Sequence, residues 1–475
     1  MRTLLRSSIL IAALAAACGG NSATTTTGAT TPAPTPGPTP TPTPTPPVVE
    51  GPTAEESLAW VEQAIAGPAK PTVADIEARF APAFLKQVPA AQVVDIFASL
   101  TTQLPPMKQL KLDSKPPLAL TALYDTASGG VRVKLEMTRT TPRQISGLIF
   151  EPAPAEAPPR TYGDAVAQLT QAGAKTQLFI AEIEKGACTP RQNHNSTDRL
   201  AIGSAMKLWV LLAVDEKLKV DKKADWDTSL PIRDESKSLP SGELQDLAAG
   251  TALPIREFAS KMIGISDNTA TDHLIDYVGR EQVEKALKLA KHGEPALDVP
   301  FLRTRELFAL KLALTPAEHE TYAKVPVAAK RKLLESYRTR PIDLEQAMKD
   351  WTAPRHLELE WFASGPDLCN VMATLGARAG WKPDSELLTI LGKNAGVPYD
   401  QSKWRYVGFK GGSEPGVMNL TWLAQRADGK WFVVVAAVND PEHMINELLV
   451  ANAGAGVLAI LGAEAPAAPA APAAP

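Results

Sequence analysis

A serine followed three residues later by a lysine provides the first side chains that could do chemistry. Ser204-Ala205-Met206-Lys207 opens an apolar run, Leu208 to Val214, which predicts a buried helix. Residues three apart on a helix lie on one face, one turn apart, so the Lys207 amine can reach the Ser204 hydroxyl. Because burial lowers the proton affinity of a lysine, Lys207 is predicted to be the general base that activates Ser204 as a nucleophile.

Two later motifs could complete this pair. Ser266-Asp267-Asn268 follows the run Met262 to Ile265, and Lys410-Gly411-Gly412-Ser413 ends a predicted strand, Tyr406 to Phe409. A single serine-lysine motif does not by itself indicate a catalytic site, because a chain of 475 residues is expected to contain on the order of one by chance. The three motifs in this order are the signature set of class A β-lactamases and penicillin-binding proteins.

From Tyr162 to about Leu461 the chain therefore resembles the class A β-lactamase-like serine hydrolases of the penicillin-recognising superfamily. Family-like sequence around the motifs, such as Leu239 to Gly242 and Thr269 to Asp272, agrees with this resemblance. The resemblance implies an α+β fold in which an antiparallel sheet is combined with a helical subdomain. Predicted strands at both ends of this region, Gln177 to Ile183 and Trp431 to Val438, imply that its two ends meet in one sheet.

The resemblance also assigns roles to the motif residues. Ser204 would attack an amide or ester carbonyl, and the backbone N–H groups of Ser204 and Ser413 would form the oxyanion hole. Ser266 would relay a proton to the leaving nitrogen, and Asn268 would hold the substrate amide and orient the lysine. Lys410 would place positive charge near a substrate carboxylate. Gly412 would let the strand backbone approach the substrate, because it has no Cβ.

Two departures from the family pattern affect these roles. Gly411 stands where the family usually has a hydroxyl residue that helps to hold the substrate carboxylate, so that task would pass to Ser413 or disappear. Glu306 is the candidate for the acid that activates hydrolytic water, but Leu310 stands where an asparagine should follow. The alternative is that Glu306 is a surface glutamate at the start of a helix, Leu307 to Leu314. An insertion, roughly 315–355, is charged and helical, and it is predicted to be a solvated face.

Residues 50–151 form a separate small α+β domain. Three helical patterns, Glu55 to Ala66, Val73 to Leu85 and Val93 to Leu100, precede three strand-like runs, Leu118 to Tyr124, Val131 to Thr138 and Gln144 to Phe150. This order is similar to the cone-shaped, steroid-isomerase-like modules, and the domain resembles the N-terminal module of a clavulanic-acid-cluster protein of the same superfamily. We expect a spacer or an interaction module, because no acid-base pair is visible in it. A Pro-Ala linker, 152–160, separates it from the hydrolase-like domain, 161–463.

The N-terminus predicts export. Residues 1–17 combine two arginines, an apolar core and a small-residue cleavage site, and Cys18 follows directly. This pattern resembles the bacterial lipobox, which implies a lipid anchor on Cys18 and a place on the cell envelope, facing the periplasm or the exterior; an ordinary secretory signal is the alternative. Residues 18–49 form a Thr/Pro-rich linker, and 464–475 are an Ala-Pro tail that is predicted to be disordered.

The charge and composition of the chain limit the kinds of molecule that it is expected to bind. A formal charge of -3 and a pI near 6.2 give no polybasic surface, so nucleic acid is not expected as a partner. The six histidines are scattered without ligand spacing, so neither a metal nor another cofactor is predicted. Cys188 and Cys369 could form a disulfide in an oxidising compartment, or they could be two buried thiols.

Three functions fit these motifs. The first is a β-lactamase in which deacylation is slow, and the second is a peptidase or esterase of the same fold acting on peptidoglycan or another carbonyl compound. The third is a lipoprotein whose acylated site senses or binds a ligand without turnover. The expected partner in each case is a small β-lactam-like or peptidoglycan-like molecule.

Overall fold

The computed structural model describes residues 51–464 apart from 68, 116, 127–128, 154–156, 339–342, 344–345 and 348–349. The chain divides into two compact units between residues 155 and 156. The export signal, Cys18, the Thr/Pro-rich linker and residues 465–475 of the tail lie outside the described residues.

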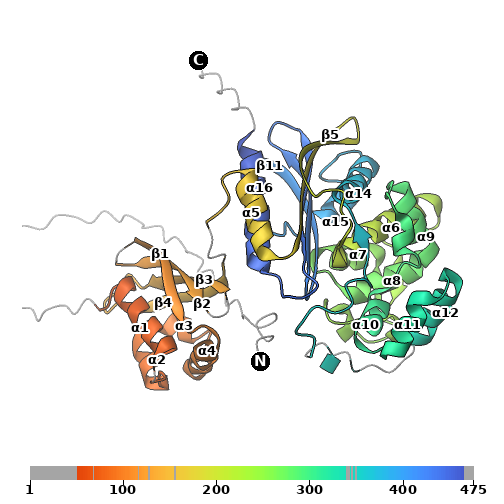
Figure 1. Cartoon of the computed structure of the whole chain (residues 1–475). Helices are drawn as coiled ribbons and strands as arrows, with labels where there is room; N and C mark the ends of the chain where they lie inside the picture. The colour runs from red at the N-terminus through yellow and green to blue at the C-terminus, as the bar shows by residue number, and fades with distance from the viewer. Residues whose placement is uncertain are drawn as a thin grey trace, which may run out of the picture. The chain divides into compact units, whose positions relative to one another are not determined.

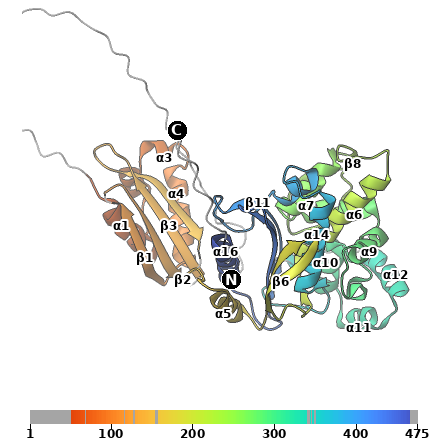
Figure 2. The same ribbon diagram turned by 90° about the horizontal axis from the view of Figure 1, so that it is seen from above.

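In the first unit, helices lie against one face of a four-stranded antiparallel sheet of order β1-β2-β3-β4 (Figure 2). Its core joins helix residues such as Leu58 and Phe97 to strand residues such as Tyr124 and Val133. The predicted order of helices followed by strands is thus confirmed, whereas the resemblance to steroid-isomerase-like modules stays a prediction. The elements are α1 (Ala54–Ala66), α2 (Val73–Arg79), α3 (Pro82–Leu85), α4 (Ala90–Gln103), β1 (Met107–Lys115), β2 (Ala119–Thr126), β3 (Gly129–Met137) and β4 (Ile145–Pro152).

The first unit differs from the prediction in two places. The helix expected over Val73 to Leu85 is broken at Phe80 and Ala81, which are extended. The cause is Pro82, because a proline disfavours helical geometry in the residue before it. Strand β1 was not predicted, since its residues are mostly exposed and polar, as expected of an edge strand.

The second unit is built around a five-stranded antiparallel sheet of order β11-β12-β13-β5-β6. Strand β5, near the start of the unit, pairs with β13, near its end, which confirms that the two ends of the region meet in one sheet. The strands of this sheet are β5 (Lys175–Glu184), β6 (Ala187–His194), β11 (Trp404–Glu414), β12 (Val417–Arg426) and β13 (Trp431–Asn439).

Helices cover both faces of this sheet (Figures 1 and 2). On one face α5 (Tyr162–Ala172) and α16 (Glu447–Ala463) pack together against the strands. On the other face lie α14 (Gly365–Arg378) and a helical region centred on α6 (Lys207–Val220), whose residues Leu208 to Val214 are all buried. The predicted combination of an antiparallel sheet with a helical subdomain is confirmed.

The helical region contains the remaining elements. Its longer helices are α7 (Ile255–Gly264), α8 (Asn268–Val278), α9 (Arg280–Leu289), α10 (Thr304–Leu312), α11 (Pro316–Lys324), α12 (Val327–Arg338) and α15 (Glu386–Leu391). Short elements connect them, namely β7 (Leu200–Ala201), β8 (Ser229–Pro231), β9 (Ala252–Pro254), β10 (Phe362–Ala363) and the 3-10 helices η2 (Gly203–Met206), η3 (Asp234–Ser236), η4 (Leu244–Asp246) and η5 (Pro295–Asp298).

Cys188 on β6 and Cys369 on α14 form a disulfide, with their Cα atoms 6.3 Å apart. This pairing decides between the two alternatives that the sequence left open for these cysteines.

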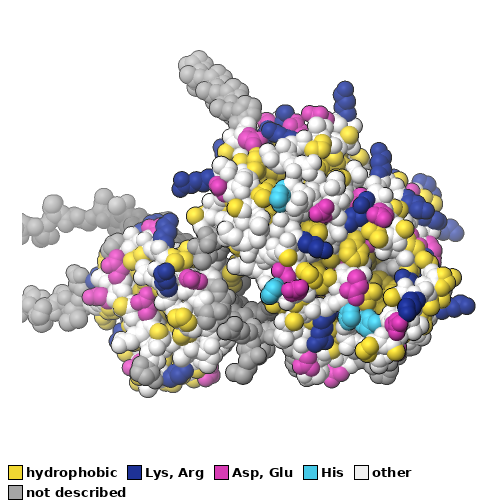
Figure 3. All heavy atoms as spheres, in the orientation of Figure 1, with side chains coloured by type: hydrophobic (Ala, Val, Ile, Leu, Met, Phe, Trp, Pro, Cys, Tyr) yellow, Lys and Arg dark blue, Asp and Glu magenta, His cyan; other side chains and the backbone are white. Residues whose placement is uncertain are grey.

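On the surface, acidic and basic side chains are interspersed over the face that Figure 3 shows. Within the described ranges, no helix has both the length and the apolar character that a membrane crossing needs. The same residues contain no group of three His, Cys, Asp or Glu side chains arranged to hold a metal ion.

Candidate active site

Ser204 lies in the 3-10 turn η2, which runs directly into α6. Lys207 is the first residue of α6 and is completely buried, because the apolar helix behind it is embedded in the core. The preceding β7 is held by the side chain of Asn439, whose amide oxygen accepts a hydrogen bond from the Ala201 N–H at 2.8 Å and whose amide donates to the Ala201 carbonyl at 3.0 Å. The turn that presents Ser204 is therefore fixed on both sides.

Three acceptors surround the Lys207 amine. Lys207 Nζ donates to the Ser266 carbonyl at 2.7 Å, to Asn268 Oδ1 at 2.8 Å and to Ser266 Oγ at 3.1 Å. Burial lowers the pKa of Lys207 well below its usual value, and the nearby Lys410 lowers it further. The Ser266 carbonyl oxygen and Asn268 Oδ1 can only accept hydrogen bonds. A neutral amine has two N–H groups, so these two acceptors can still hold Lys207 Nζ when it is not protonated. The site thus favours an oriented amine that can take up a proton.

Ser266 joins the two lysines of the site. Its backbone has a φ of +59°, an uncommon conformation for a residue with a side chain. Lys410 Nζ, on β11, donates to Ser266 Oγ at 3.1 Å, the same hydroxyl that Lys207 contacts. Burial lowers the pKa of Lys410 to about 7.

Asp267 holds the loop that carries Ser266. This buried carboxylate caps α8 by accepting from the Ala270 N–H at 2.7 Å, and it also accepts from the backbone N–H groups of Glu243 and Leu244 at 2.8 and 2.9 Å. Sequence reasoning gave Asp267 no role, although its place between Ser266 and Asn268 was a signal. Asp267 thereby positions both neighbours.

Gly412 allows β11 to lie against the turn of Ser204. A Cβ added at Gly412 would lie 2.0 Å from the Ile202 carbonyl oxygen and 2.5 Å from the Ser204 nitrogen. A Cβ at Gly203 would lie 3.2 Å from the Ser413 nitrogen, so the turn and the strand are in contact at the two amides expected to form the oxyanion hole. A glycine at position 412 therefore lets β11 approach the turn of Ser204, and its role toward the substrate stays a prediction.

The departure at Gly411 also has a steric explanation. A Cβ at this position would lie 2.7 Å from the ring of Phe409, which covers the space next to it. The hydroxyl side chain that the family usually has at this point would therefore clash with Phe409.

These residues line one cavity of about 450 Å³. Both polar motif residues and apolar side chains contribute to it, and no Asp, Glu or His is among the described residues that line it. The lining residues are Ser204, Pro240, Ser241, Ile263, Gly264, Ile265, Ser266, Asn268, Phe308, Asn394, Phe409, Lys410, Gly411, Gly412, Ser413, Met418 and Leu420.

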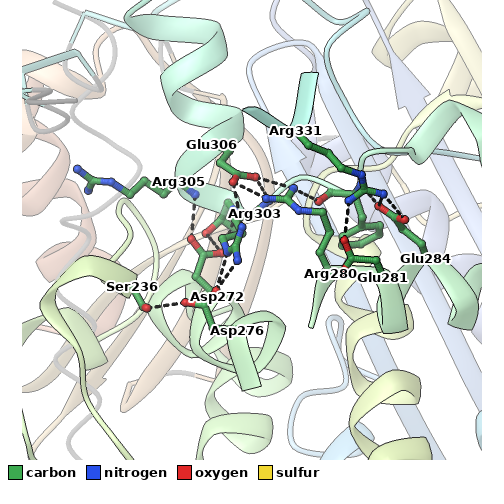
Figure 4. A network of polar contacts seen from close by, with 12 residues as sticks. Ser236, Asp272, Asp276, Arg280, Glu281, Glu284, Arg303, Arg305, Glu306 and Arg331 are labelled. Carbon is green, nitrogen blue, oxygen red and sulfur yellow. Dashed lines mark hydrogen bonds and ion pairs between the residues drawn. The ribbon is translucent and has the colours of Figure 1, made fainter. Parts of the chain in front are cut away.

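Glu306 is not brought to this cavity. It lies in the first turn of α10 and is completely buried, with Oε1 accepting from Arg280 at 2.6 Å and from Arg303 at 3.0 Å (Figure 4). Its Oε2 accepts from the Arg303 N–H at 2.8 Å. Two guanidinium groups engage the carboxylate, so Glu306 is not placed to activate water at Ser204, and it is not a surface residue either. Leu310 is buried and does not line the cavity.

The insertion is not only a solvated face. Tyr322, Leu334 and Tyr337 are buried in the main core, and Arg331 on α12 pairs with Glu281 and Glu284 of α9 (Figure 4). Trp351 is also buried and packs edge-on against Phe308, which lines the cavity, with 6.0 Å between the ring centroids. The insertion therefore supports one wall of the site.

Two family models match parts of this chain. Residues 162–307 match the model described as the Beta-lactamase enzyme family. Residues 49–138 match a model described as ORF 12 gene product N-terminal. No curated protein matches the chain. The expected relation of the first unit to a clavulanic-acid-cluster protein stays a prediction.

Several solved structures are similar to the chain. A β-lactamase from Sphaerobacter thermophilus is 21% identical with a TM-score of 0.44, and the match covers 64% of this chain and 98% of that one. A β-lactamase from Francisella tularensis is 12% identical with a TM-score of 0.45, covering 63% and 98%. PBP-A is 17% identical with a TM-score of 0.41, covering 64% and 98%.

The family match, the sheet topology and the convergence of the motif side chains lead to the same classification. The larger unit has a β-lactamase-like fold, and its residues 162–307 match the Beta-lactamase enzyme family.

Proposed function

We propose that the larger unit is a serine hydrolase domain that is acylated at Ser204 by β-lactams or related amides and esters, and that it is a class A-type β-lactamase with slow deacylation. The observation that carries the proposal is the cavity itself. It brings Ser204 and Ser266 together with Lys410 beside the buried amine of Lys207, while none of its described lining residues is a carboxylate or an imidazole.

Acylation would use the groups already in place. The Ser204 hydroxyl oxygen forms a bond to the carbonyl carbon as its proton passes to Lys207 Nζ, and the carbonyl π electrons move to the oxygen. The amides of Ser204 and Ser413 stabilise that oxyanion. When the C–N bond breaks, the Ser266 hydroxyl gives a proton to the leaving nitrogen and regains one from Lys207. The product is an ester of Ser204.

Deacylation requires a further base. A water molecule must lose a proton as its oxygen attacks the ester carbon, and Ser204 must regain a proton as the ester bond breaks. In class A enzymes the accepted base for this step is a glutamate. Glu306, the only candidate that the sequence offered, is held by Arg280 and Arg303. The acyl-enzyme is therefore expected to be long-lived.

A chromogenic cephalosporin should give a burst of product equal to one equivalent of protein, followed by much slower turnover. The burst is expected because acylation uses Ser204, Lys207 and Ser266, whereas no carboxylate among the described lining residues can accelerate hydrolysis of the ester. Stopped-flow absorbance measures the two phases, and intact-mass spectrometry of quenched samples measures the fraction of acyl-enzyme.

The matched variant for this measurement is Glu306→Gln, which keeps the size of the side chain. We expect an unchanged deacylation rate with lower thermal stability, because breaking a buried ion pair costs about 3–5 kcal/mol. A linear progress curve with rapid turnover that collapses in Glu306→Gln would contradict slow deacylation.

The pH profile of acylation should differ between substrates that carry a carboxylate and substrates that do not. Burial lowers the pKa of Lys410 to about 7, so its charge is present below this pH and is lost above it. For a penicillin with a free carboxylate, the acylation efficiency kcat/KM should therefore fall as the pH rises above about 7. Acylation rates measured across the pH range with a stopped assay would show this descending limb.

The methyl ester of the same penicillin is the control. Because it has no carboxylate for Lys410 to bind, its descending limb should be absent or much weaker. Identical pH profiles for acid and ester would show that Lys410 does not recognise the carboxylate.

The absence of a carboxylate from the described lining residues also fits a second candidate, a peptidase, esterase or acylated sensor directed at peptidoglycan-like molecules. A peptidase or esterase would release its product when water slowly cleaves the Ser204 ester, whereas a sensor would keep the ester without turnover.

We also propose that the protein is exported and lipid-anchored through Cys18 to the bacterial cell envelope, a proposal supported by the composition of residues 1–18.

A further inference from the structure

A buried lysine behind the cavity connects two chain segments that meet at the nucleophile. Lys311 lies on α10, three residues after Phe308, and its side chain is completely shielded from solvent. Lys311 Nζ forms ion pairs with Glu360, at 3.1 Å, and with Glu414. The ring of Trp351 covers it, with its centroid 5.9 Å from Nζ. A charged group this far from water is retained only if its partners are close and well oriented.

The first carboxyl partner belongs to the strand that carries Ser413. Glu414 is the last residue of β11, directly after Ser413, and it pairs with Val417 at the start of β12. Its ion pair with Lys311 therefore fixes the end of β11, where the strand turns into β12. A displacement of Glu414 would move the Ser413 amide, which lies against Gly203.

The second carboxyl partner leads to the segment that carries Ser204. Glu360 Oε2 accepts a hydrogen bond from the Trp361 N–H at 2.9 Å, and the Trp361 carbonyl accepts one from the Ile202 N–H at 3.0 Å. Phe362 of β10 then pairs with Ala201 of β7. Glu360 thus holds the strand beside residues 200–202, immediately before the turn of Ser204.

The pKa shift of Glu414 is consistent with a stable cluster of Lys311, Glu360 and Glu414. Burial raises the pKa of Glu414 well above its usual value, and the neighbouring Glu360 raises it further, while Lys311 opposes the shift. The raised pKa of Glu414 favours a protonated carboxyl group there, which reduces the negative charge that a single lysine has to balance.

We propose that Lys311 is a positioning residue for the oxyanion hole, in which its ion pairs to Glu414 and Glu360 hold the Ser413 and Ser204 amides at a fixed separation. This proposal rests on the proposed function, since it concerns the acylation of Ser204. It adds a residue outside the three sequence motifs, and that residue touches neither substrate nor nucleophile. Its effect should appear when negative charge develops on the carbonyl oxygen, and not when substrate merely binds.

The test compares Lys311→Met with wild type in three measurements. We expect the rate of acylation by a fluorescent penicillin to fall by about 10-fold or more, since loss of one oxyanion donor costs about 10²–10³. Affinity for an aryl boronic acid, whose adduct with serine places an oxygen in the oxyanion hole, should fall by a similar factor. Non-covalent binding of the same penicillin, measured in the Ser204→Ala background, should change little.

Two further variants control for folding. Lys217→Met removes another lysine of this unit, one that donates to the Tyr277 carbonyl, and it should acylate at the wild-type rate. If Lys311→Met alone fails to fold, the triple variant Lys311→Met, Glu360→Gln, Glu414→Gln removes all the ionisable groups of the cluster and should fold while still acylating slowly.

The outcomes separate this inference from the proposed function. A folded Lys311→Met or triple variant that acylates and binds the boronic acid as wild type does would overturn the role of Lys311. A loss of acylation matched by an equal loss of non-covalent binding would also overturn it. Wild-type protein that reacts with neither probe would overturn the proposed function and this inference with it.

Discussion

Ser204→Ala protein is expected to take up no covalent label from a fluorescent penicillin, whereas wild-type protein should approach one label per chain. Among the described residues, Ser204 is the only hydroxyl that lies one turn before a buried lysine at the start of α6 and that lines the cavity beside the Ser413 amide. Removing the nucleophile of a serine hydrolase lowers the rate by a factor on the order of 10⁶, so labelling should fall below detection.

The site of labelling can be read directly from the sequence. Trypsin should release residues 200–207 as one peptide, because Arg199 and Lys207 flank it, and the adduct should be found on this peptide by mass spectrometry. Ser402→Ala, which removes an exposed serine of the same unit, is the matched control and should label as wild type does. An adduct on any other peptide would remove Ser204 from its proposed role.

Replacement of Lys207 is expected to have the next largest effect. Lys207→Met should lower the acylation rate by about 10²–10⁴, the range typical of a lost general base, while the chain stays folded because an unbranched apolar side chain fits the buried position. Lys207→Arg should be nearly as impaired. A guanidinium group keeps positive charge but does not release its proton near neutral pH.

The comparison of these two variants identifies what the lysine supplies. If Lys207 acts by charge alone, Lys207→Arg should retain most of the activity. If it acts as a base, both variants should fail, and penicillin should still bind non-covalently to each. Acylation of Lys207→Met at the wild-type rate would exclude Lys207 from the mechanism. Pre-steady-state labelling rates, together with thermal melting, provide the measurements.

The proximity of Ser204 and Lys207 could be predicted from the sequence because residues three apart on a helix lie one turn apart. Ser204 and Lys207 are adjacent through one helical turn, and the apolar run after them is the buried α6. The strands β5 and β13 were also predictable, since their burial produces long apolar runs. The edge strands β1 and β6 were not, because more than half of the residues in each are polar and more than half are exposed.

Residues that act through tertiary contacts could not be found in this way. Glu306 had a suitable distance from Ser266 along the chain, but its carboxylate is directed to Arg280 and Arg303, which sequence spacing does not reveal. Trp351 belongs to the insertion that was expected to be a solvated face, and Lys311 to the predicted helix Leu307 to Leu314, yet both side chains are buried. Their partners, Phe308 and Glu414, are distant in sequence, so only the fold shows these contacts.

The disulfide between Cys188 and Cys369 separates the proposed catalytic residues into those inside and those outside one covalent loop. It closes a loop of 181 residues that contains Ser204, Lys207 and Ser266, while Lys410 lies outside the loop. In the chain-entropy account, a covalent loop of this length restricts the unfolded chain by roughly 5 kcal/mol. Protein made in a reducing cytoplasm would lack this restriction. Oxidative folding conditions are therefore expected to stabilise the assembly of the helical region that carries Ser204, Lys207 and Ser266 with strand β11, which carries Lys410.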